Sequence, residues 1–492
     1  MTHELASAPP AMTPSQSGML AALAARLPAR TIVTDPELIA PWLTDWRGRY
    51  HGRAPALLQP ASTEEVAVIV AAAAEHRVSL VPQGGNTSMV GGATPPADGS
   101  ALLLSLRRMN RVRSVDPDAG LAIVEAGAIL ADLHAAALAA GRRFPLTLGA
   151  RGSATIGGLV STNAGGTQVL RWGTMRGLVA GIEAVLPDGS IHHGLAALKK
   201  DNRGYDLKEL LVGAEGTLGI VTAATLRLAP AIAARAVAWA GVADPHAALI
   251  LLRLFQARTD AIESFELLPA ESLAAVLAHL PQARAPLGGE HRWHVLIEAV
   301  AASEDVEPPA ALLERLLADS LETGLVADAA IAASEAQAEA FWMLRDSISA
   351  GERAQGPATQ HDISVPLDAV PAFLLDAATA CEARFPGTHA SGFGHLGDGN
   401  VHFHVRAPAG APAERWYAEE APVVTRFVHD LVVAAGGSIS AEHGIGQMKR
   451  DELARLSSPA RMAVLRGVKR ALDPHDLLNP GKLVLAQGDA AQ

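Results

Sequence analysis

One stretch of this chain limits its fold more than any other: the nineteen-residue segment Leu148–Gly166, which contains six glycines. Small polar side chains, including Ser153, Thr155 and Asn163, are interleaved with these glycines. A connecting loop rarely needs so many residues that tolerate positive φ together with so many hydrogen-bonding groups. Close approach of the backbone to a large polyanionic ligand does need them. The segment therefore predicts the wall of a cofactor site.

Two further glycine-rich segments have the same character. Residues 82–92 (PQGGNTSMVGG) follow an apolar, strand-like run, and residues 211–221 (LVGAEGTLGIV) place three glycines around Thr217. Paired glycines let successive N–H groups converge on an anion. Neither segment has the lysine of an ATP-binding P-loop or the GxGxxG spacing of a Rossmann fingerprint. Each alone is compatible with a tight structural loop, but together the three predict a dinucleotide held mainly by backbone donors.

Residue types that bind metals cluster in the C-terminal part. The cluster comprises His395, Asp398, His402, His404, Glu442 and His443. In a strand, period-two alternation puts His402 and His404 on the same face. Imidazole and carboxylate groups together suit a borderline divalent cation such as Zn²⁺ or Mn²⁺. Taken singly, a strand histidine is more often a hydrogen-bonded core or surface group, and Asp398 also suits a structural turn.

Two other segments carry groups suited to an acidic substrate. Residues 342–349 show a helical pattern that places Arg345 and Ser349 on one face, and a guanidinium is a bidentate donor for carboxylates. An ordinary surface ion pair explains Arg345 equally well. Residues 361–366 (HDISVP) predict a strand ended by proline, in which Asp362 is either a supporting partner or an edge residue.

Length and composition set the scale and exclude several classes. At about 150 residues per domain, 492 residues predict two to four domains. Helices and short strands alternate to about residue 230, whereas residues 231–340 show mainly helical patterns. A net charge of −11 with scattered basic residues argues against nucleic acid or anionic membrane as the main partner. The single cysteine, Cys381, excludes an internal disulfide and a cysteine-based metal cluster.

The location expected from the sequence is the cytoplasm. Residues 1–17 lack a basic segment followed by an apolar one, so we expect no secretory signal. Residues 78–97 and 152–170 are uncharged and long enough to suggest membrane spans, but their glycine, proline and polar residues predict loops.

The motifs together resemble one known family. They are GGNTSMVGG, TIGGLVSTNAGG, VGAEGTLGIVT, HDISVP, GHLGDGNVHFHV, AEHGIGQMKR and the closing LNPGK of residues 478–482. These motifs occur in this order over roughly residues 46–485. They are similar to those of the FAD-linked D-2-hydroxy acid dehydrogenases. That group includes D-2-hydroxyglutarate and D-lactate dehydrogenases and glycolate oxidase large-subunit relatives. The resemblance implies an α+β fold with a two-lobed FAD-binding domain of the vanillyl-alcohol-oxidase (PCMH) type. An α+β cap domain with an antiparallel sheet is expected to follow.

The resemblance also implies boundaries and cofactor contacts. We expect an N-terminal lead and helix over residues 1–45, the FAD-binding domain over 46–230, the substrate or cap domain over 231–435, and a segment over 436–492 that returns to the FAD domain. The implied FAD-binding residues are Pro82, Gly84, Gly85, Asn86, Thr87, Gly149, Thr155, Gly157, Gly158, Ser161, Asn163, Gly165, Gly166, Gly213, Glu215, Gly216, Thr217, Gly219, Ile220 and Asn479. Some members of the wider superfamily tether FAD through a histidine in the first loop. Asn86 holds that place here, so non-covalent FAD is expected.

The same resemblance assigns the chemistry. His395, His402 and Glu442 are the implied metal ligands, with Zn²⁺ the expected ion, and His443 is the implied base. The implied substrate contacts are Arg345, Ser349, Gln360, His404 and His443. The expected reaction oxidises a D-2-hydroxy acid of the D-2-hydroxyglutarate or D-lactate type to the 2-oxo acid, with hydride transfer to flavin N5. Two departures concern the recognition of a second substrate carboxylate: Gln360 stands where lysine is usual, and His404 where asparagine is frequent.

Three alternatives share the flavin fold. A redox-neutral flavin-dependent transferase of the alkyl ether-lipid synthase type needs a long apolar tunnel, which no segment near the histidine cluster suggests. The complete His/Glu set argues against a non-catalytic FAD-carrying subunit of a glycolate oxidase complex, and an NADPH-using reductase would lack that set. The expected partners are a small 2-hydroxy acid, an electron acceptor (an electron-transferring flavoprotein, a quinone or a cytochrome) and, by analogy, a second copy in a homodimer.

Overall fold

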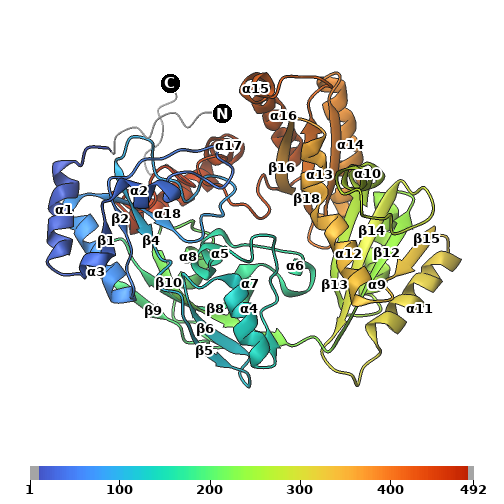
Figure 1. The fold of residues 1–492 in the computed structure, drawn as a ribbon, viewed down its shortest axis with the longest axis horizontal. Coiled ribbons are helices and arrows are strands. Elements are labelled where there is room, and N and C mark those ends of the chain that lie inside the picture. The colour runs from blue at the N-terminus through green and yellow to red at the C-terminus, as the bar shows by residue number, and fades with distance from the viewer. Residues whose placement is uncertain (1–9, 486–492) are drawn as a thin grey trace.

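The computed structural model describes residues 10–485, which form two lobes side by side (Figure 1). The first lobe contains the chain to about residue 230, and the second contains most of the chain from there to residue 434. The last helices return to the first lobe. Of the N-terminal lead and helix expected over residues 1–45, residues 1–9 lie outside the described residues.

The first lobe holds a small four-stranded sheet in the order β1–β2–β4–β3. Its strands are β1 (Ile32–Val33), β2 (Leu57–Leu58), β3 (Ser79–Gln83) and β4 (Ala101–Ser105). β2 and β3 both run parallel to β4, and α3 (Thr63–His76) connects them. The Ser62 hydroxyl accepts a hydrogen bond from the Glu65 N–H at the start of this helix, and Arg77 ends it in the left-handed conformation. α3 packs on α1 (Pro14–Ala24), and their buried faces share one core with β3 and β4.

A five-stranded antiparallel sheet, in the order β5–β6–β10–β8–β9, forms the rest of this lobe. Its strands are β5 (Val112–Asp116), β6 (Leu121–Glu125), β8 (Val179–Val185), β9 (Ile191–Gly194) and β10 (Ile220–Arg227). The accompanying helices are α4 (Leu130–Ala139), α5 (Ile156–Thr162), α6 (Val169–Trp172), α7 (Met175–Leu178) and α8 (Leu207–Leu211). Apolar residues of α4, α5 and α7 bury one face of the sheet in a second core. A short pair, β7 (Arg142–Arg143) with β11 (Ala229–Pro230), lies where the chain leaves the lobe.

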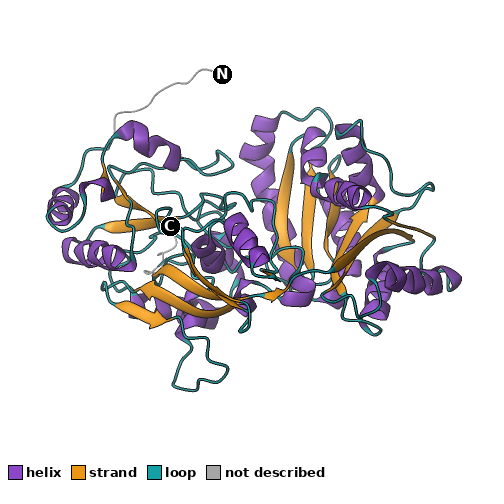
Figure 2. Ribbon diagram, turned by 60° about the horizontal axis from the view of Figure 1, so that its bottom comes forward, coloured by secondary structure: helices purple, strands orange, loops and turns teal. Residues whose placement is uncertain are grey.

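The second lobe is built on a seven-stranded sheet in the order β15–β12–β14–β13–β17–β18–β16, with every neighbouring pair antiparallel. Its strands are β12 (Ala234–Val242), β13 (Ile262–Pro269), β14 (Trp293–Ala301), β15 (Asp328–Ile331), β16 (Ala358–Ser364), β17 (His389–His395) and β18 (Asn400–Arg406). Figure 2 shows helices on both faces of this sheet. One face packs on α9 (Pro245–Gln256), α11 (Pro309–Glu322), α14 (Val370–Arg384) and α16 (Ala421–Ala434). The other carries α10 (Ala270–His279), α12 (Glu335–Asp346) and α13 (Ile348–Ala354).

This architecture is the α+β fold with an antiparallel second sheet that the sequence implied. The mainly helical pattern expected over residues 231–340 is corrected, because β12 and β13 lie there as central strands. Residues 235–242 (RAVAWAGV) are rich in alanine and buried on both faces from residue 236 onward. A strand buried on both faces shows no alternation of apolar and polar residues, so the period-two signal is absent.

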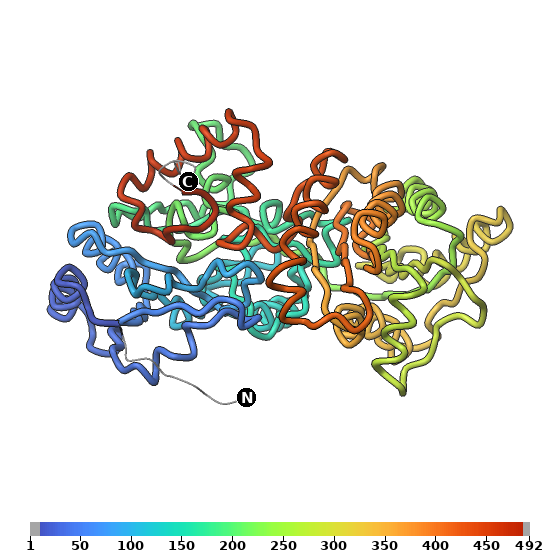
Figure 3. The backbone as a smooth tube through the Cα atoms, turned by 90° about the horizontal axis from the view of Figure 1, so that it is seen from above, coloured from blue at the N-terminus to red at the C-terminus, as the bar shows by residue number. Residues whose placement is uncertain are grey.

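The chain crosses between the lobes a second time through residues 435–449, which we call the crossing segment. Beyond it, α17 (Arg450–Leu456) and α18 (Pro459–Leu472) lie on the first lobe (Figure 3). Leu478 then forms a parallel bridge with Leu80 of β3 and is fully buried in the first-lobe core. Residues near both ends of the described chain therefore build one core.

A buried carboxylate also joins the lobes. Glu263 on β13 is 1% exposed and pairs with Arg143 and Arg171 of the first lobe, while the Trp172 indole N–H donates to it over 3.3 Å. Unpaired, a buried carboxylate would be strongly unfavourable, so these partners favour the docked arrangement. Among the helices of residues 10–485, none has the length and apolarity needed to cross a membrane.

Candidate active site

A cavity of about 660 Å³ opens in the first lobe and reaches the crossing segment, within the size range of cofactor sites. Most of the predicted FAD-binding residues line it: Pro82, Gly84, Gly85, Asn86, Thr87, Gly149, Thr155, Gly157, Gly158, Ser161, Gly165, Glu215, Gly216, Gly219, Ile220 and Asn479. Glu442 and His443 lie on the same wall. The three glycine-rich segments thus meet around one space, which also reaches two residues of the histidine and carboxylate cluster.

Direct contact between two of these segments explains why glycine is needed. A Cβ on Gly84 would lie 2.1 Å from Oγ1 of Thr155, and one on Gly85 would lie 1.9 Å from the carbonyl oxygen of Ser153. Asn86 adopts φ +56°, and its side-chain N–H donates to the carbonyl oxygen of Thr44. The loop after β3 is therefore pressed against the segment that leads into α5.

We expect replacement of Gly85 by alanine to weaken FAD binding. The added methyl group would overlap the Ser153 backbone, and overpacking of about 1–3 kcal/mol corresponds to roughly 5- to 150-fold in affinity. The measurement is the flavin-to-protein absorbance ratio after gel filtration. Gly152→Ala is the matched control, because a Cβ there meets no atom within 4 Å. Equal flavin retention in the two variants would show that this contact does not shape the cofactor site.

Unpartnered polar atoms on the wall fit a bound dinucleotide. Oε1 of Gln83, Oγ1 of Thr155 and Oδ1 of Asn479 are buried without a hydrogen-bond partner, and all three residues line the cavity. The Asn479 amide N–H groups donate to the carbonyl oxygens of Gly92 and Glu215, so its side chain is held in place. Buried polar groups ordinarily have partners, and a polar cofactor would supply them.

Four predicted FAD-binding residues lie outside the cavity lining. Asn163 ends α5 at φ +50° and accepts a hydrogen bond from the N–H of Arg176. Gly166 packs against the backbone of Thr147, and Thr217 donates to the carbonyl oxygen of Ala214. Gly213 adopts φ +81° in the turn after α8. These residues shape the loops behind the wall.

The three predicted metal ligands come together. One ligand atom each from His395, His402 and Glu442 can be chosen so that all lie within 4.8 Å of one another. His395 ends β17 and His402 lies on the neighbouring β18, on the same face of the sheet, while the crossing segment brings Glu442 to them. The three contacts therefore depend on sheet register and on the second crossing between the lobes.

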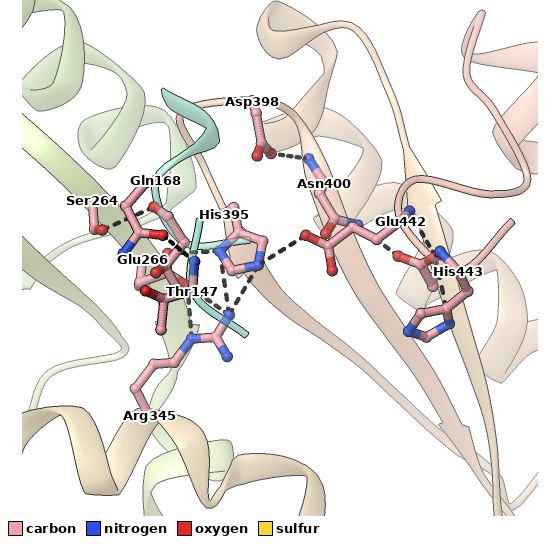
Figure 4. Close-up of polar contacts among 12 residues, drawn as sticks. Thr147, Gln168, Ser264, Glu266, Arg345, His395, Asp398, Asn400, Glu442 and His443 are labelled. Atoms are coloured by element: carbon pink, nitrogen blue, oxygen red, sulfur yellow. Dashed lines mark hydrogen bonds and ion pairs between the residues drawn. The ribbon is translucent and has the colours of Figure 1, made fainter. Parts of the chain in front are cut away.

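Strand register also supplies a partner for His395 that the sequence did not reveal. Glu266 on β13 lies directly opposite His395, and its carboxylate accepts from His395 Nδ1 over 2.6 Å and from Arg345 Nε over 2.7 Å (Figure 4). On the other side of the ring, Nε2 is 3.8 Å from Oε1 of Glu442. A carboxylate behind a histidine fixes its orientation and makes it a more basic metal ligand.

Burial and neighbouring charges shift the pKa of each group in this cluster. Burial lowers the pKa of His395, but Glu266 outweighs it and raises the pKa to about 9. Burial and the charge of His395 place the pKa of His402 well below its ordinary value, so His402 is neutral. Burial raises the pKa of Glu442, whose Oε1 is buried without a hydrogen-bond partner. Two imidazoles and a carboxylate with an unpartnered oxygen fit a divalent metal ion.

Asp362 positions the predicted base. It lies opposite His402 in the sheet, is 3% exposed, and accepts from the backbone N–H groups of Glu442 and His443 over 3.0 and 2.9 Å. Its Oδ2 is 3.5 Å from Nδ1 of His443. Burial opposes ionisation, yet His443 and Lys449 lower the pKa of Asp362. Of the two roles left open by the sequence, the structure gives Asp362 that of a supporting partner.

The remaining predicted substrate contacts lie outside the lining of the cavity. Arg345 contacts Glu266 and His395, so an ion pair occupies part of its guanidinium. The single helix expected over residues 342–349 is corrected, because α12 ends at Asp346 and α13 begins at Ile348. Ser349 thus belongs to a different helix from Arg345.

A second buried carboxylate, that of Glu352, was not predicted from the sequence and lies near the last two predicted substrate contacts. Gln360 and His404 are opposite each other in β16 and β18, and Nδ1 of His404 is hydrogen-bonded to buried Glu352 of α13. The Ser272 hydroxyl donates to the same carboxylate over 2.7 Å. The only local signal for Glu266 is an acidic residue in the largely apolar segment 262–269, whereas the polar segment around Glu352 gives no such signal.

Known proteins share both the sequence and the fold. Residues 54–194 match the family described as "FAD binding domain", and residues 232–483 match "FAD linked oxidases, C-terminal domain". The chain is 37% identical over 470 residues to a D-2-hydroxyglutarate dehydrogenase of Bos taurus, covering 94% of this chain and 83% of that protein. The chain belongs to the FAD-linked D-2-hydroxy acid dehydrogenase family.

Other relatives of this FAD-linked oxidoreductase agree. A D-2-hydroxyglutarate dehydrogenase of Xanthomonas citri pv. viticola is 36% identical, covering 93% of this chain and 95% of the relative. Among solved structures, p-cresol methylhydroxylase matches with a TM-score of 0.75 at 14% identity, covering 98% of this chain and 100% of that one. An alkyldihydroxyacetonephosphate synthase matches with a TM-score of 0.72 at 16% identity, covering 97% and 88%. At such identities these two structures bear on the fold alone.

Proposed function

We propose that this dehydrogenase oxidises a D-2-hydroxy acid, of the D-2-hydroxyglutarate or D-lactate type, to the 2-oxo acid, with a divalent metal ion and His443 as base. One observation carries the proposal: the cavity lined by the glycine-rich segments continues to Glu442 and His443, next to the cluster of His395 and His402. Bound FAD supplies the acceptor for the hydride of the substrate Cα, and a bound metal ion supplies a Lewis acid that favours ionisation of the 2-hydroxyl.

The residues that hold these groups follow from the site. His395, His402 and Glu442 hold the metal ion, for which Zn²⁺ is the proposed identity, and Glu266 orients His395 from behind. The cavity wall holds FAD without a covalent link, because Asn86 has no nucleophilic side chain and donates to Thr44. Arg345 keeps its charge beside Glu266, which raises its pKa against the effect of burial. Its positive charge favours a substrate carboxylate near the metal.

His443 has the setting of a general base. Asp362 lies beside Nδ1, which leaves Nε2 to take the hydroxyl proton. Burial lowers the pKa of His443, although Asp362 acts in the opposite direction. The imidazole is therefore neutral at pH 7, the state in which it accepts a proton as the hydride leaves.

A dye-linked screen tests the proposed reaction. Purified protein is mixed with D-lactate, D-2-hydroxyglutarate, glycolate and D-malate, with a reducible dye as electron acceptor and metal analysis of the same sample. We expect D-2-hydroxy acids, and not their L isomers, to reduce the dye and to bleach the flavin anaerobically. A flavin that no hydroxy acid reduces would overturn the proposal and favour a redox-neutral transferase.

The physiological acceptor is proposed to be an electron-transferring flavoprotein, a quinone or a cytochrome. The same assay separates these classes, because the anaerobically reduced enzyme can be mixed with each and the return of the oxidised flavin spectrum followed. The class that restores it fastest is the acceptor. Rapid reoxidation by oxygen alone would instead identify an oxidase.

A further inference from the structure

Arg47 is a positive charge on the active-site wall that the proposed chemistry does not use. It lines the same cavity as Glu442 and His443, and its charge is close enough to lower the pKa of His443. Its Nε is buried without a hydrogen-bond partner. Within residues 10–485, no carboxylate forms an ion pair with its guanidinium. A half-buried arginine without an ion pair on a ligand cavity would be stabilised by charge-assisted hydrogen bonds to a bound anion.

The loop around Arg47 holds it in place. The Asp45 carboxylate accepts from three backbone N–H groups, those of Arg47 at 3.1 Å and of Arg49 and Tyr50 at 2.6 Å, so its oxygens are used by the turn. The Arg47 guanidinium carbon lies 5.0 Å from the ring centroid of Trp46, within the range of a cation–π contact. A guanidinium held in this way loses less conformational entropy when it binds a ligand.

Two other positive charges act on Arg47, and the Asp45 carboxylate of its own loop acts in the opposite direction. Burial, then the charges of Arg353 and Arg49, lower the pKa of Arg47. Arg353 lies on α13, so the two arginines come from opposite lobes. A bound anion at this junction would relieve both their repulsion and the burial of Arg47.

The other candidates for binding a second substrate carboxylate are engaged or neutral. Arg345 is paired with Glu266, and the Lys449 ammonium donates to the carbonyl oxygens of Asp362 and Ile439. Gln360 carries no charge. Of these groups, Arg47 alone combines a positive charge outside any ion pair with a place on the cavity wall.

We propose that Arg47 binds the distal carboxylate of a dicarboxylic D-2-hydroxy acid and thereby sets the preference for dicarboxylic over monocarboxylic substrates. This inference rests on the proposed dehydrogenase function. It assigns the carboxylate next to the reacting carbon to the metal and Arg345, and the far carboxylate to the junction between the lobes.

The test compares substrates in the holoenzyme carrying Arg47→Gln. For D-2-hydroxyglutarate and D-malate we expect kcat/KM to fall by about 10- to 100-fold, mainly through KM, as for loss of a charge-assisted hydrogen bond. For D-lactate and D-2-hydroxybutyrate we expect a change within about twofold. Arg47→Lys, which keeps the charge, should lose less than Arg47→Gln. Equal losses for both substrate classes, or no loss for either, would overturn the assignment.

Controls separate this proposal from folding and from the proposed function. Arg26→Gln changes an exposed arginine of the same lobe outside the Arg47 loop and should alter neither substrate class. Flavin content and melting temperature report folding of each variant. Glutarate, which has no hydroxyl group to oxidise, supplies a readout without turnover: it should perturb the flavin spectrum of the unaltered protein and do so more weakly in Arg47→Gln. If no hydroxy acid is oxidised but glutarate binding still depends on Arg47, the proposed reaction is contradicted and the proposed carboxylate site is supported. If glutarate binding is independent of Arg47, the proposed carboxylate site is contradicted.

Discussion

Replacing His443 with asparagine is expected to lower turnover by about 10²- to 10⁴-fold while FAD remains bound, the loss typical of removing a general base. Asparagine keeps a polar group of similar size but cannot take a proton at neutral pH. The Asp362 carboxylate would still accept from the backbone N–H groups of residues 442 and 443, so the crossing segment should keep its place. Anaerobic stopped-flow reduction of the flavin measures the step directly.

The pH profile gives a second readout of the same substitution. Burial places the pKa of His443 below the ordinary imidazole value of 6.5. In the unaltered enzyme kcat/KM should therefore have reached its plateau by neutral pH and should fall as acid protonates the base. The acid limb should disappear in His443→Asn. His475→Asn, a change at an exposed histidine, is the control and should keep both rate and profile. Unchanged turnover in His443→Asn would contradict the assignment.

Removal of the proposed metal ion is the second change expected to abolish most activity. Dialysis against a chelator should lower turnover by more than about tenfold, and Zn²⁺ or Mn²⁺ should restore it. Glu442→Gln should act in the same way, because it replaces the one carboxylate ligand by an amide with almost no change in size. Elemental analysis and turnover are measured on the same samples.

The control for Glu442→Gln is Glu419→Gln, which alters a surface pair with Arg415 and should retain metal and activity. Flavin content should stay constant in both variants, so that metal loss is separated from cofactor loss. Full turnover by protein shown to contain no metal, or a full complement of metal in Glu442→Gln, would contradict the proposed ligand set.

The sequence predicted the parts of the site that repeat a local pattern. Alternation in β18 correctly placed His402 and His404 on one face, because strand periodicity depends only on neighbouring residues. The glycine-rich segments predicted one cavity wall, since close backbone packing leaves no room for a Cβ at Gly84 or Gly85. The strand predicted at HDISVP is also present, as part of β16.

The parts that were missed depend on contacts between distant residues. Glu266 meets His395 across 129 positions, through a register between β13 and β17 that no short window contains. β13 itself was not predicted, so its carboxylate had no expected partner. Arg47 belongs to a short loop without periodicity, and only the folded arrangement places it on the cavity that Glu442 and His443 also line. The break at Ser347 between α12 and α13 likewise has no proline or glycine to mark it.

The crossing segment is tied to both lobes. Near its middle, the N–H groups of Glu442 and His443 bind Asp362 of the second lobe; two residues on, those of Ile445 and Gly446 bind the Glu215 carboxylate of the first lobe, each over 2.7 Å. A rotation of one lobe against the other would therefore strain this short segment, which carries the proposed metal ligand Glu442 and the proposed base His443. Metal affinity and the position of His443 should thus depend on how the two lobes are docked. A crosslink that held the lobes apart would be expected to lower turnover without altering any residue that contacts the substrate.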